Sequence, residues 1–202
     1  MQAMTNARSV EFYFDFGSPA AYLAATQLPH LCADTGAELV WKPMLLGGVF
    51  QATGNRSPVE IPAKAPYVFE DLKRFARRYA VPFQYNPNFP INTLLLMRGA
   101  TGLQMREPER FRAYADAMFD AMWVASRNLN DPAVVGEVLA EAGFDPARVL
   151  ALANDPDTKS RLKADTEAAV RRGVFGAPTL FVGDQMFWGQ DRLDFVREAL
   201  GA

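Results

Sequence analysis

The segment Gly17-Ser18-Pro19 holds the first side chain that could carry chemistry. A strand-like run over residues 10–16 precedes it, and serine followed by proline is typical of the cap and first position of a helix. The Ser18 hydroxyl would then lie among free backbone N–H groups at the positive end of the helix dipole. From there it could donate a hydrogen bond to a thiolate that a ligand brings in, which lowers the pKa of that thiol. The alternative is that Ser18 only caps the helix.

Two backbone features near the C-terminus could bind a ligand. Ala177-Pro178 stands directly before a predicted strand, and a cis peptide bond there would turn the backbone of Ala177 toward an extended peptide. Gly189-Gln190-Asp191 predicts another helix start, whose N–H groups suit an α-carboxylate, while Asp191 could pair with an amino group. Each feature also has a plain structural interpretation, as a proline that marks a strand start or as a helix cap.

The chain of 202 residues has one cysteine, Cys32, and one histidine, His30. A single cysteine excludes an internal disulfide, a Cys-x-x-Cys redox pair and a multi-cysteine metal site, and no metal site is expected. We expect Cys32 to be a buried, inert thiol and His30 to lie on the surface near a helix C-terminus. Neither residue is predicted to take part in catalysis.

Composition narrows the class of protein. Charged residues make up 22% of the chain and the net charge is -2, so no basic balance indicates nucleic-acid binding. No apolar stretch approaches the roughly 20 residues of a membrane span, and the polar N-terminus is unlike a signal peptide. We therefore expect a soluble cytoplasmic protein that binds neither nucleic acid nor membranes.

The elements that must position these residues fall into three blocks. The first is a strand over 10–16, a helix from Pro19 to about Asp34 that Gly36 ends, and a strand over 38–42. Helical periodicity then runs from about Pro66 to Arg172. Helix starts are predicted at Asn92-Thr93, Glu107-Pro108, Asp131-Pro132 and Asp145-Pro146. The last block holds strands over 179–182 and 185–188, joined by a Gly183-Asp184 turn, and a helix from Arg192 to Leu200.

This order, β-α-β followed by helices and then β-β-α, predicts an α/β thioredoxin-like fold with a large all-helical insertion. We expect residues 9–47 and 173–202 to form the thioredoxin-like domain and residues 48–172 the helical insertion domain. In such a fold Ser18, Ala177 and the start of the last helix face one another. A thiolate site, a peptide-pairing edge and a site for a zwitterionic amino-acid end together match reduced glutathione.

Three motifs carry a family resemblance. They are Phe14-Asp15-Phe16-Gly17-Ser18-Pro19, Val174-Phe175-Gly176-Ala177-Pro178-Thr179-Leu180-Phe181-Val182-Gly183-Asp184 and Phe187-Trp188-Gly189-Gln190-Asp191-Arg192-Leu193. These motifs closely resemble 2-hydroxychromene-2-carboxylate isomerases, which are relatives of the kappa-class glutathione transferases. The resemblance extends from about residue 10 to 200 and includes 90–98, which resembles a helix start of both groups.

The resemblance implies glutathione as the cofactor and a role for each of the residues singled out above. Ser18 would activate the glutathione sulfur, and Ala177, before the cis-proline Pro178, would pair with the glutathione backbone. Gln190 and Asp191 would hold the γ-glutamyl end.

Two further positions resemble an asparagine and a lysine of the kappa transferases. They are Asn55 and Lys64, and a lysine there would meet the glycyl carboxylate of glutathione as a point charge. The loop between Pro58 and Ala63 departs from the kappa pattern. The alternative for Lys64 is a solvated surface side chain.

The resemblance also implies a reaction, a small aromatic carboxylate as substrate and a homodimer. The thiolate would add to a conjugated carbon of 2-hydroxychromene-2-carboxylate, ring opening and rotation would follow, and elimination would give trans-o-hydroxybenzylidenepyruvate without consuming glutathione. Phe50 and Trp188 could wall a pocket for the aromatic acid, or pack in the core. Two other functions stay open: a kappa-like glutathione transferase acting on other electrophiles, and a non-catalytic thioredoxin-like module that binds peptides.

Overall fold

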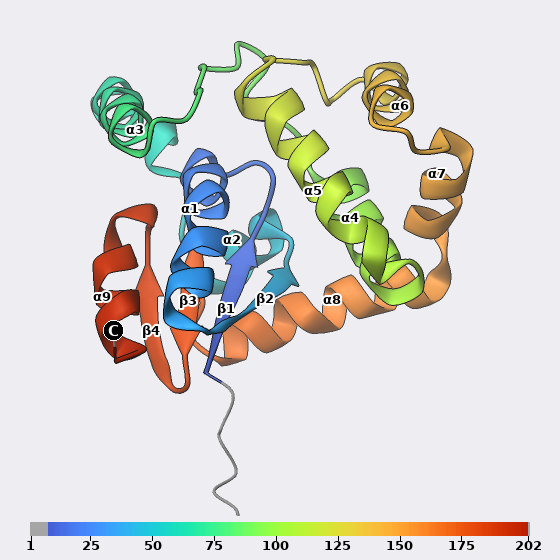
Figure 1. The fold of residues 1–202 in the computed structure, drawn as a ribbon. Coiled ribbons are helices and arrows are strands. Elements are labelled where there is room, and N and C mark those ends of the chain that lie inside the picture. Colours follow the sequence, from blue (N-terminus) through green and yellow to red (C-terminus); the bar gives the residue numbers. More distant parts are fainter. Residues whose placement is uncertain (1–7, 202) are drawn as a thin grey trace, which may run out of the picture.

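The computed structural model describes residues 8–201 and is built around a four-stranded mixed sheet (Figure 1). Strand β1 (Ser9–Phe14) pairs in parallel with β2 (Glu38–Pro43) and antiparallel with β3 (Thr179–Val182). Strand β4 (Gln185–Trp188) pairs antiparallel with β3, so the order across the sheet is β2-β1-β3-β4. Segments from the two ends of the chain therefore form one sheet, and the predicted thioredoxin-like fold is confirmed.

The first helix follows the predicted signals closely. Helix α1 (Pro19–Thr35) has Ser18 as its N-cap and Gly36, at φ 64°, as its C-cap. The predicted strand over 10–16 was too long, because β1 ends at Phe14. Asp15 leaves the strand since its carboxylate accepts the backbone N–H of Gly17 at 2.8 Å, which turns the chain toward the helix start.

Between β2 and β3 the described residues form helices joined by loops, and no strand. They are α2 (Leu46–Thr53), the 3₁₀ turn η1 (Pro58–Glu60), α3 (Ala65–Tyr79), α4 (Leu94–Arg106), α5 (Pro108–Trp123), α6 (Pro132–Glu141), α7 (Pro146–Asn154) and α8 (Pro156–Arg171). The starts predicted at Asp131 and Asp145 are confirmed, since each carboxylate accepts a backbone N–H of the first turn at 2.9 Å. Asp155 caps α8 in the same way, a start that the sequence interpretation missed.

Two predicted helix boundaries were wrong by one residue. Thr93, not Asn92, occupies the cap position of α4, although the Asn92 side chain does accept the N–H of Leu94 at 3.0 Å. The last helix begins with a 3₁₀ turn, η2 (Gln190–Arg192), after Gly189 at φ 107°, and α9 spans Leu193–Ala199. The division of the chain into domains at 47/48 and 172/173 stays a prediction.

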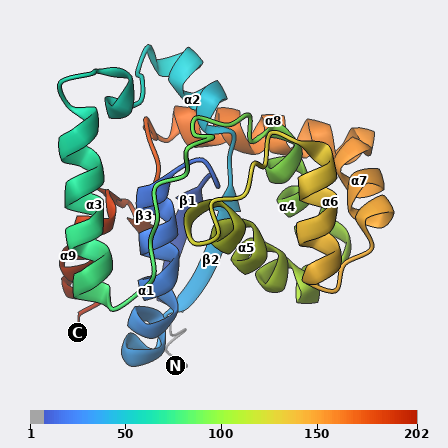
Figure 2. The same cartoon turned by 90° about the horizontal axis from the view of Figure 1, so that it is seen from above.

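Helices cover both faces of the sheet. Helices α1 and α9 lie on one face, and α8 crosses the other (Figures 1 and 2). Alternate side chains of β1 serve the two layers: Phe12 and Phe14 belong to the large core that includes α1, whereas Tyr13 packs in a smaller cluster with Ala169 of α8. The sheet is thus the middle layer, with α1 and α9 on one side and α8 on the other.

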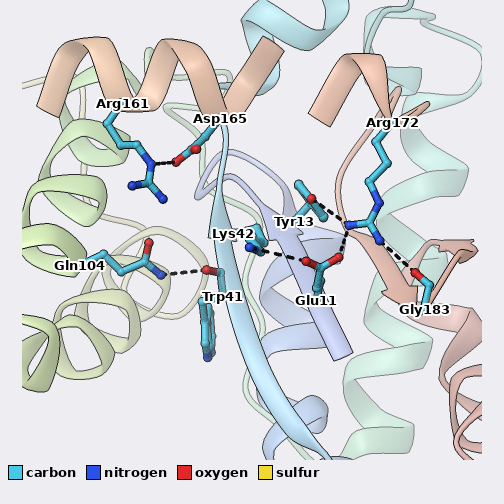
Figure 3. Close-up of polar contacts among 9 residues, drawn as sticks. All are labelled: Glu11, Tyr13, Trp41, Lys42, Gln104, Arg161, Asp165, Arg172 and Gly183. Atoms are coloured by element: carbon cyan, nitrogen blue, oxygen red, sulfur yellow. Dashed lines mark hydrogen bonds and ion pairs between the residues drawn. The ribbon is translucent and has the colours of Figure 1, made fainter. Parts of the chain in front are cut away.

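The end of α8 is fixed to the sheet by one arginine, Arg172 (Figure 3). Its guanidinium donates hydrogen bonds to the Glu11 carboxylate and, at 3.2 Å, to the Tyr13 hydroxyl, both on β1. It also donates to the carbonyl oxygen of Gly183, in the β3–β4 turn, at 2.9 Å. One side chain therefore sets where the chain leaves the helical block and re-enters the sheet.

We predict that the close approach of α4 to α7 makes Gly102 intolerant of any side chain. A Cβ atom there would lie 2.9 Å from Cβ and 3.2 Å from the carbonyl carbon of Leu152. Gly102→Ala should therefore lower the free energy of unfolding in urea by about 1–3 kcal/mol through overpacking.

The matched control is Gly47→Ala in α2, where a Cβ atom would meet nothing within 4 Å. Alanine should stabilise that helix by up to about 1 kcal/mol. Equal unfolding free energies for the two variants would contradict the close helix contact.

Candidate active site

Ser18 joins the start of α1 to the segment before β3. Its Oγ accepts the backbone N–H of Ala21 at 3.1 Å, as an N-cap does. The same hydroxyl donates to the carbonyl oxygen of Ala177, 159 residues away in sequence, at 2.9 Å. The Ala177–Pro178 bond is cis, as the fold predicted. Ser18 therefore does more than cap the helix: it reaches the segment that we expected to pair with a peptide.

A cleft of about 260 Å³ opens beside this hydrogen bond. Five of the seven predicted site residues line it: Ser18, Asn55, Ala177, Gln190 and Asp191. Pro178 lies directly behind Ala177 without reaching the lining. Phe50 and Trp188 do line the cleft, and Leu46, Tyr67 and Phe89 add to its apolar wall. The structure thus brings together two helix starts, one backbone edge and an aromatic wall.

The backbone of Ala177 has one hydrogen-bonding group that is occupied and one that is free. Its carbonyl oxygen already accepts the Ser18 hydroxyl, while its N–H has no hydrogen-bond acceptor among the described residues. A bound peptide can therefore pair with this N–H at no cost in internal hydrogen bonds. Pairing with the carbonyl oxygen would use its second lone pair or displace Ser18.

The start of the last helix is held by an aromatic hydroxyl. Tyr79 of α3 donates to the carbonyl oxygen of Gln190 at 2.7 Å. The pKa of Tyr79 is raised to about 12, mainly by burial and in second place by the nearby Asp191 carboxylate. Asp191 itself pairs with Arg192 at 2.6 Å. An amino group bound by Asp191 would have to share the carboxylate with this exposed arginine.

Asn55 lines the cleft, whereas Lys64 does not. The Asn55 side chain donates to the carbonyl oxygen of Phe175 at 2.8 Å and accepts the backbone N–H of Arg56 at 2.8 Å, so it ties the loop after α2 to the segment before the cis-proline. Lys64 is exposed at the start of α3 and does not line the cleft. The turn η1 lies between the two residues, and the predicted contact of Lys64 with the glycyl carboxylate stays a prediction.

Arg56 is the residue that sequence reasoning missed here. Of the described residues that line the cleft, it alone carries a positive charge, whereas Asp71 and Asp191 carry negative charges. No carboxylate among the described residues pairs with its guanidinium, while Asp71 is already bonded to Arg74 at 3.2 Å. Its position next to Asn55 in the sequence was the signal that could have found it.

Comparison with known proteins places the chain in a family. Residues 9–201 match the DsbA-like thioredoxin domain. The chain is 31% identical over 195 residues to the 2-hydroxychromene-2-carboxylate isomerase of Sphingobium xenophagum, which covers 96% of this chain and 98% of that protein. A solved 2-hydroxychromene-2-carboxylate isomerase superposes with a TM-score of 0.84 at 31% identity, covering 96% of this chain and 94% of the other. The chain belongs to the 2-hydroxychromene-2-carboxylate isomerase family.

Human glutathione S-transferase kappa 1 is a more distant relative of this isomerase family member. It is 27% identical over 206 residues, covering 96% of this chain and 91% of the transferase.

Disulfide exchange needs an accessible thiolate. The one cysteine of this chain, Cys32, is 4% exposed, so the prediction of a buried thiol is confirmed. Burial raises its pKa to about 11, which favours the predicted lack of reactivity.

The buried residue Asp15 fixes the backbone just before Ser18. Asp15 is 1% exposed, and its oxygens accept three hydrogen bonds: from the N–H of Gly17 and of Leu46, both at 2.8 Å, and from the hydroxyl of Thr93 at 3.0 Å. The carbonyl oxygen of Asp15 accepts the N–H of Ser18 at 3.0 Å. Burial raises the pKa of the Asp15 carboxyl, and the three hydrogen bonds oppose that rise.

We expect Asp15→Asn to lower the free energy of unfolding by about 1–3 kcal/mol at neutral pH. An amide has one acceptor oxygen, so its NH₂ group would face one of the three donors and leave it unsatisfied. Denaturant titration of the variant and the wild type measures this loss, and Asp184→Asn in the exposed β3–β4 turn is the control that should change nothing.

The pH dependence gives this prediction a sign. Because the folded pKa of Asp15 lies above its ordinary value, the folded state holds the proton more tightly than the unfolded chain does. The stability that this group contributes therefore grows as the pH falls through the raised pKa, and is absent above it. The gap between wild type and Asp15→Asn should widen in acid; a gap that narrows would contradict a raised pKa.

Proposed function

We propose that this chain is a glutathione-dependent isomerase that converts 2-hydroxychromene-2-carboxylate, or a similar intermediate of aromatic catabolism, to trans-o-hydroxybenzylidenepyruvate. The observation that carries the proposal is the Ser18 hydroxyl, which sits at the start of α1 within a cleft and within hydrogen-bond distance of the residue before a cis-proline. The isomerases to which this chain is similar act, by their name, on that substrate.

The residues of the cleft fit glutathione. The free N–H of Ala177 can pair with the peptide backbone, and the start of η2 at Gln190 and Asp191 suits the γ-glutamyl end. Glutathione, when bound, supplies a thiolate nucleophile that can add to and leave a conjugated carbon. Ser18 stabilises the charged sulfur by a hydrogen bond, and the first turn of α1, where the N–H of Ala20 has no acceptor among the described residues, adds the positive end of the helix dipole.

The Ser18 hydroxyl has to turn in order to do this. It would exchange a neutral hydrogen bond to the Ala177 carbonyl for a charge-assisted one to sulfur, while Oγ keeps accepting the N–H of Ala21. A charge-assisted bond contributes about 1.5–3 kcal/mol and a neutral one about 1 kcal/mol, so the net gain is about 1 kcal/mol. The serine is thus expected to shift the thiol pKa by about 1, a modest effect.

The apolar wall suits an aromatic carboxylate. Phe50, Tyr67, Phe89 and Trp188 line the cleft, and Trp188 is 47% exposed with its ring centroid 5.2 Å from that of Phe175. An aryl ring can pack there against existing side chains. The guanidinium of Arg56 is then the nearest cation for a ligand carboxylate, either of the substrate or of the glycyl end of glutathione.

A kappa-like glutathione transferase is the second candidate, favoured by the 27% identity to the human kappa enzyme. The two reactions differ in the fate of the thiol, since an isomerase returns it unchanged and a transferase leaves it in the product. Chromatography of the reaction mixture after turnover decides between them. A peptide-binding module without catalysis is the third candidate, and it predicts no turnover.

Location and assembly are also proposals. None of the helices within residues 8–201 is long and apolar enough to cross a membrane. The cytoplasmic location and the homodimer that the resemblance implies stay predictions.

Calorimetric titration with reduced glutathione at neutral pH tests the proposal first, and one saturable site per chain is the expected result. Ser18→Ala should raise the pKa of the bound thiol by about 1, measured from the ultraviolet absorbance of the thiolate across a pH series. Ser18→Thr, which keeps a hydroxyl and can still cap α1, is the control and should restore the lower pKa. Full isomerase turnover by Ser18→Ala with an unchanged thiol pKa would refute the role of Ser18.

Arg56 and Lys64 give a matched pair for the carboxylate of the ligand. Arg56→Gln should weaken glutathione binding about fivefold, since a partly exposed ion pair contributes up to about 1 kcal/mol, whereas Lys64→Gln should change little. This titration contains no substrate, so weaker binding would assign Arg56 to glutathione, and repeating it with the glycyl ethyl ester of glutathione should remove the difference between Arg56→Gln and the wild type. Unchanged glutathione binding in Arg56→Gln would show that Arg56 does not bind the glycyl end.

A further inference from the structure

A second and larger cavity, of about 600 Å³, lies between α2, α4 and α8. None of the residues that line it lines the Ser18 cleft. Helix α2 is the wall between the two: Leu46 and Phe50 face the Ser18 cleft, whereas Gly48, Gln51 and Ala52 face the larger cavity. The cavity is therefore a separate candidate site, and we name it the α8 pocket.

The bottom of the α8 pocket is apolar. It is formed by Leu45, Leu94, Leu162 and Val170, of which Leu162 is buried and the others are half-buried. Contact between α2 and α8 closes its inner end, where the N–H of Leu45 donates to the hydroxyl of Thr166 at 3.0 Å. A pocket of this volume is within the range that holds small organic ligands, about 300–1,000 Å³.

Cations surround this apolar bottom. Four of the lining residues are positively charged, namely Arg98, Lys159, Lys163 and Arg171, and one, Glu167, is negatively charged. Lys163 pairs weakly with Glu167 at 3.9 Å. Arg98, Lys159 and Arg171 have no ion-pair partner within residues 8–201. Most of the other arginines within these residues do have one. In a chain of net charge -2, this is a local excess of positive charge without internal compensation.

The cations follow one face of a helix. On α8 the lining residues fall at steps of three and four, so Lys159, Lys163 and Arg171 stand along the same stripe as Leu162 and Val170. Long basic side chains on such a stripe can lay their methylene stems along the apolar wall and keep their charged ends at the mouth. This arrangement provides an apolar interior and a cationic mouth in one pocket.

We propose that the α8 pocket binds an amphipathic carboxylate, meaning one carboxylate on an elongated alkyl or aryl body. The apolar bottom needs an apolar body, and the unpaired cations at the mouth need an anion. A polyphosphate fits less well, because it offers no apolar body to the leucine and valine side chains of the bottom. The proposal does not depend on the function proposed for the Ser18 cleft.

Calorimetric titration of the whole chain with dodecanoate, repeated in saturating reduced glutathione, tests the proposal. One site per chain should appear, with the same dissociation constant in both titrations. The double variant Arg98→Gln/Arg171→Gln should weaken it about tenfold, since each partly exposed charge pair contributes up to about fivefold. Glu167→Gln removes the one carboxylate of the pocket and should tighten binding about twofold. These opposite signs separate a charge effect from damage to the fold.

Three results would overturn the proposal. Binding that glutathione abolishes would place dodecanoate in the Ser18 cleft. Binding unchanged in the double variant and in Glu167→Gln would be nonspecific adsorption to apolar surface. A wild-type dimer that does not bind dodecanoate, but that the double variant converts to monomer in sedimentation, would show that a second copy of the chain covers this face.

Discussion

The buried carboxylate of Asp15 is the constraint on which the site depends. A charged group this far from water is costly unless its lone pairs are satisfied, and here three donors from three segments satisfy them. Those donors are Gly17 at the turn into α1, Leu46 at the start of α2 and Thr93 at the cap of α4. The cost of leaving the carboxylate unpaired therefore forces the starts of three helices to meet at one point.

This convergence explains why the candidate cleft lies where it does. With the start of α1 fixed by Asp15, Ser18 can reach the Ala177 carbonyl just before the neighbouring strand β3, and Asn55, in the loop that leaves α2, can reach the Phe175 carbonyl. Both contacts run from a side chain of the N-terminal part to the backbone before the cis-proline. Each contributes only about 1 kcal/mol, so they do not hold the fold together. Their effect is to set the distance between the two walls of the cleft.

The parts of this structure that sequence reasoning predicted are those with local causes. Ser18 before Pro19 and Asp145 before Pro146 announce helix starts because cap and first turn are adjacent in the chain. Asp15 was seen only as part of a motif, since its partners at Leu46 and Thr93 lie far along the chain and nothing in the local sequence names them.

Lys64 shows a second limit, which is the path of a loop. Asn55 lines the cleft directly after Gly54, which ends α2 at φ 69°, whereas Lys64 does not line it. Between Asn55 and Lys64 the chain makes a 3₁₀ turn with its own capping box at Ser57, and this turn carries the lysine away to the start of α3. Loop directions of this kind depend on turn geometry that composition does not reveal.

The two cavities on either side of α2 would bind their proposed anionic ligands by different interactions. The Ser18 cleft offers helix starts and a free N–H at Ala177, with Arg56 as its one cation among the described residues. Backbone dipoles in a half-enclosed cleft act at hydrogen-bond range and are hardly screened by salt. The α8 pocket instead offers mobile side-chain charges at an open mouth, whose attraction reaches further and falls with ionic strength. A rise in salt should therefore separate the two sites, leaving a thiol peptide bound in the cleft while a carboxylate leaves the pocket. Helix α2, which separates the two cavities, has no charged side chain. The difference therefore comes from the residues that face α2 across each cavity.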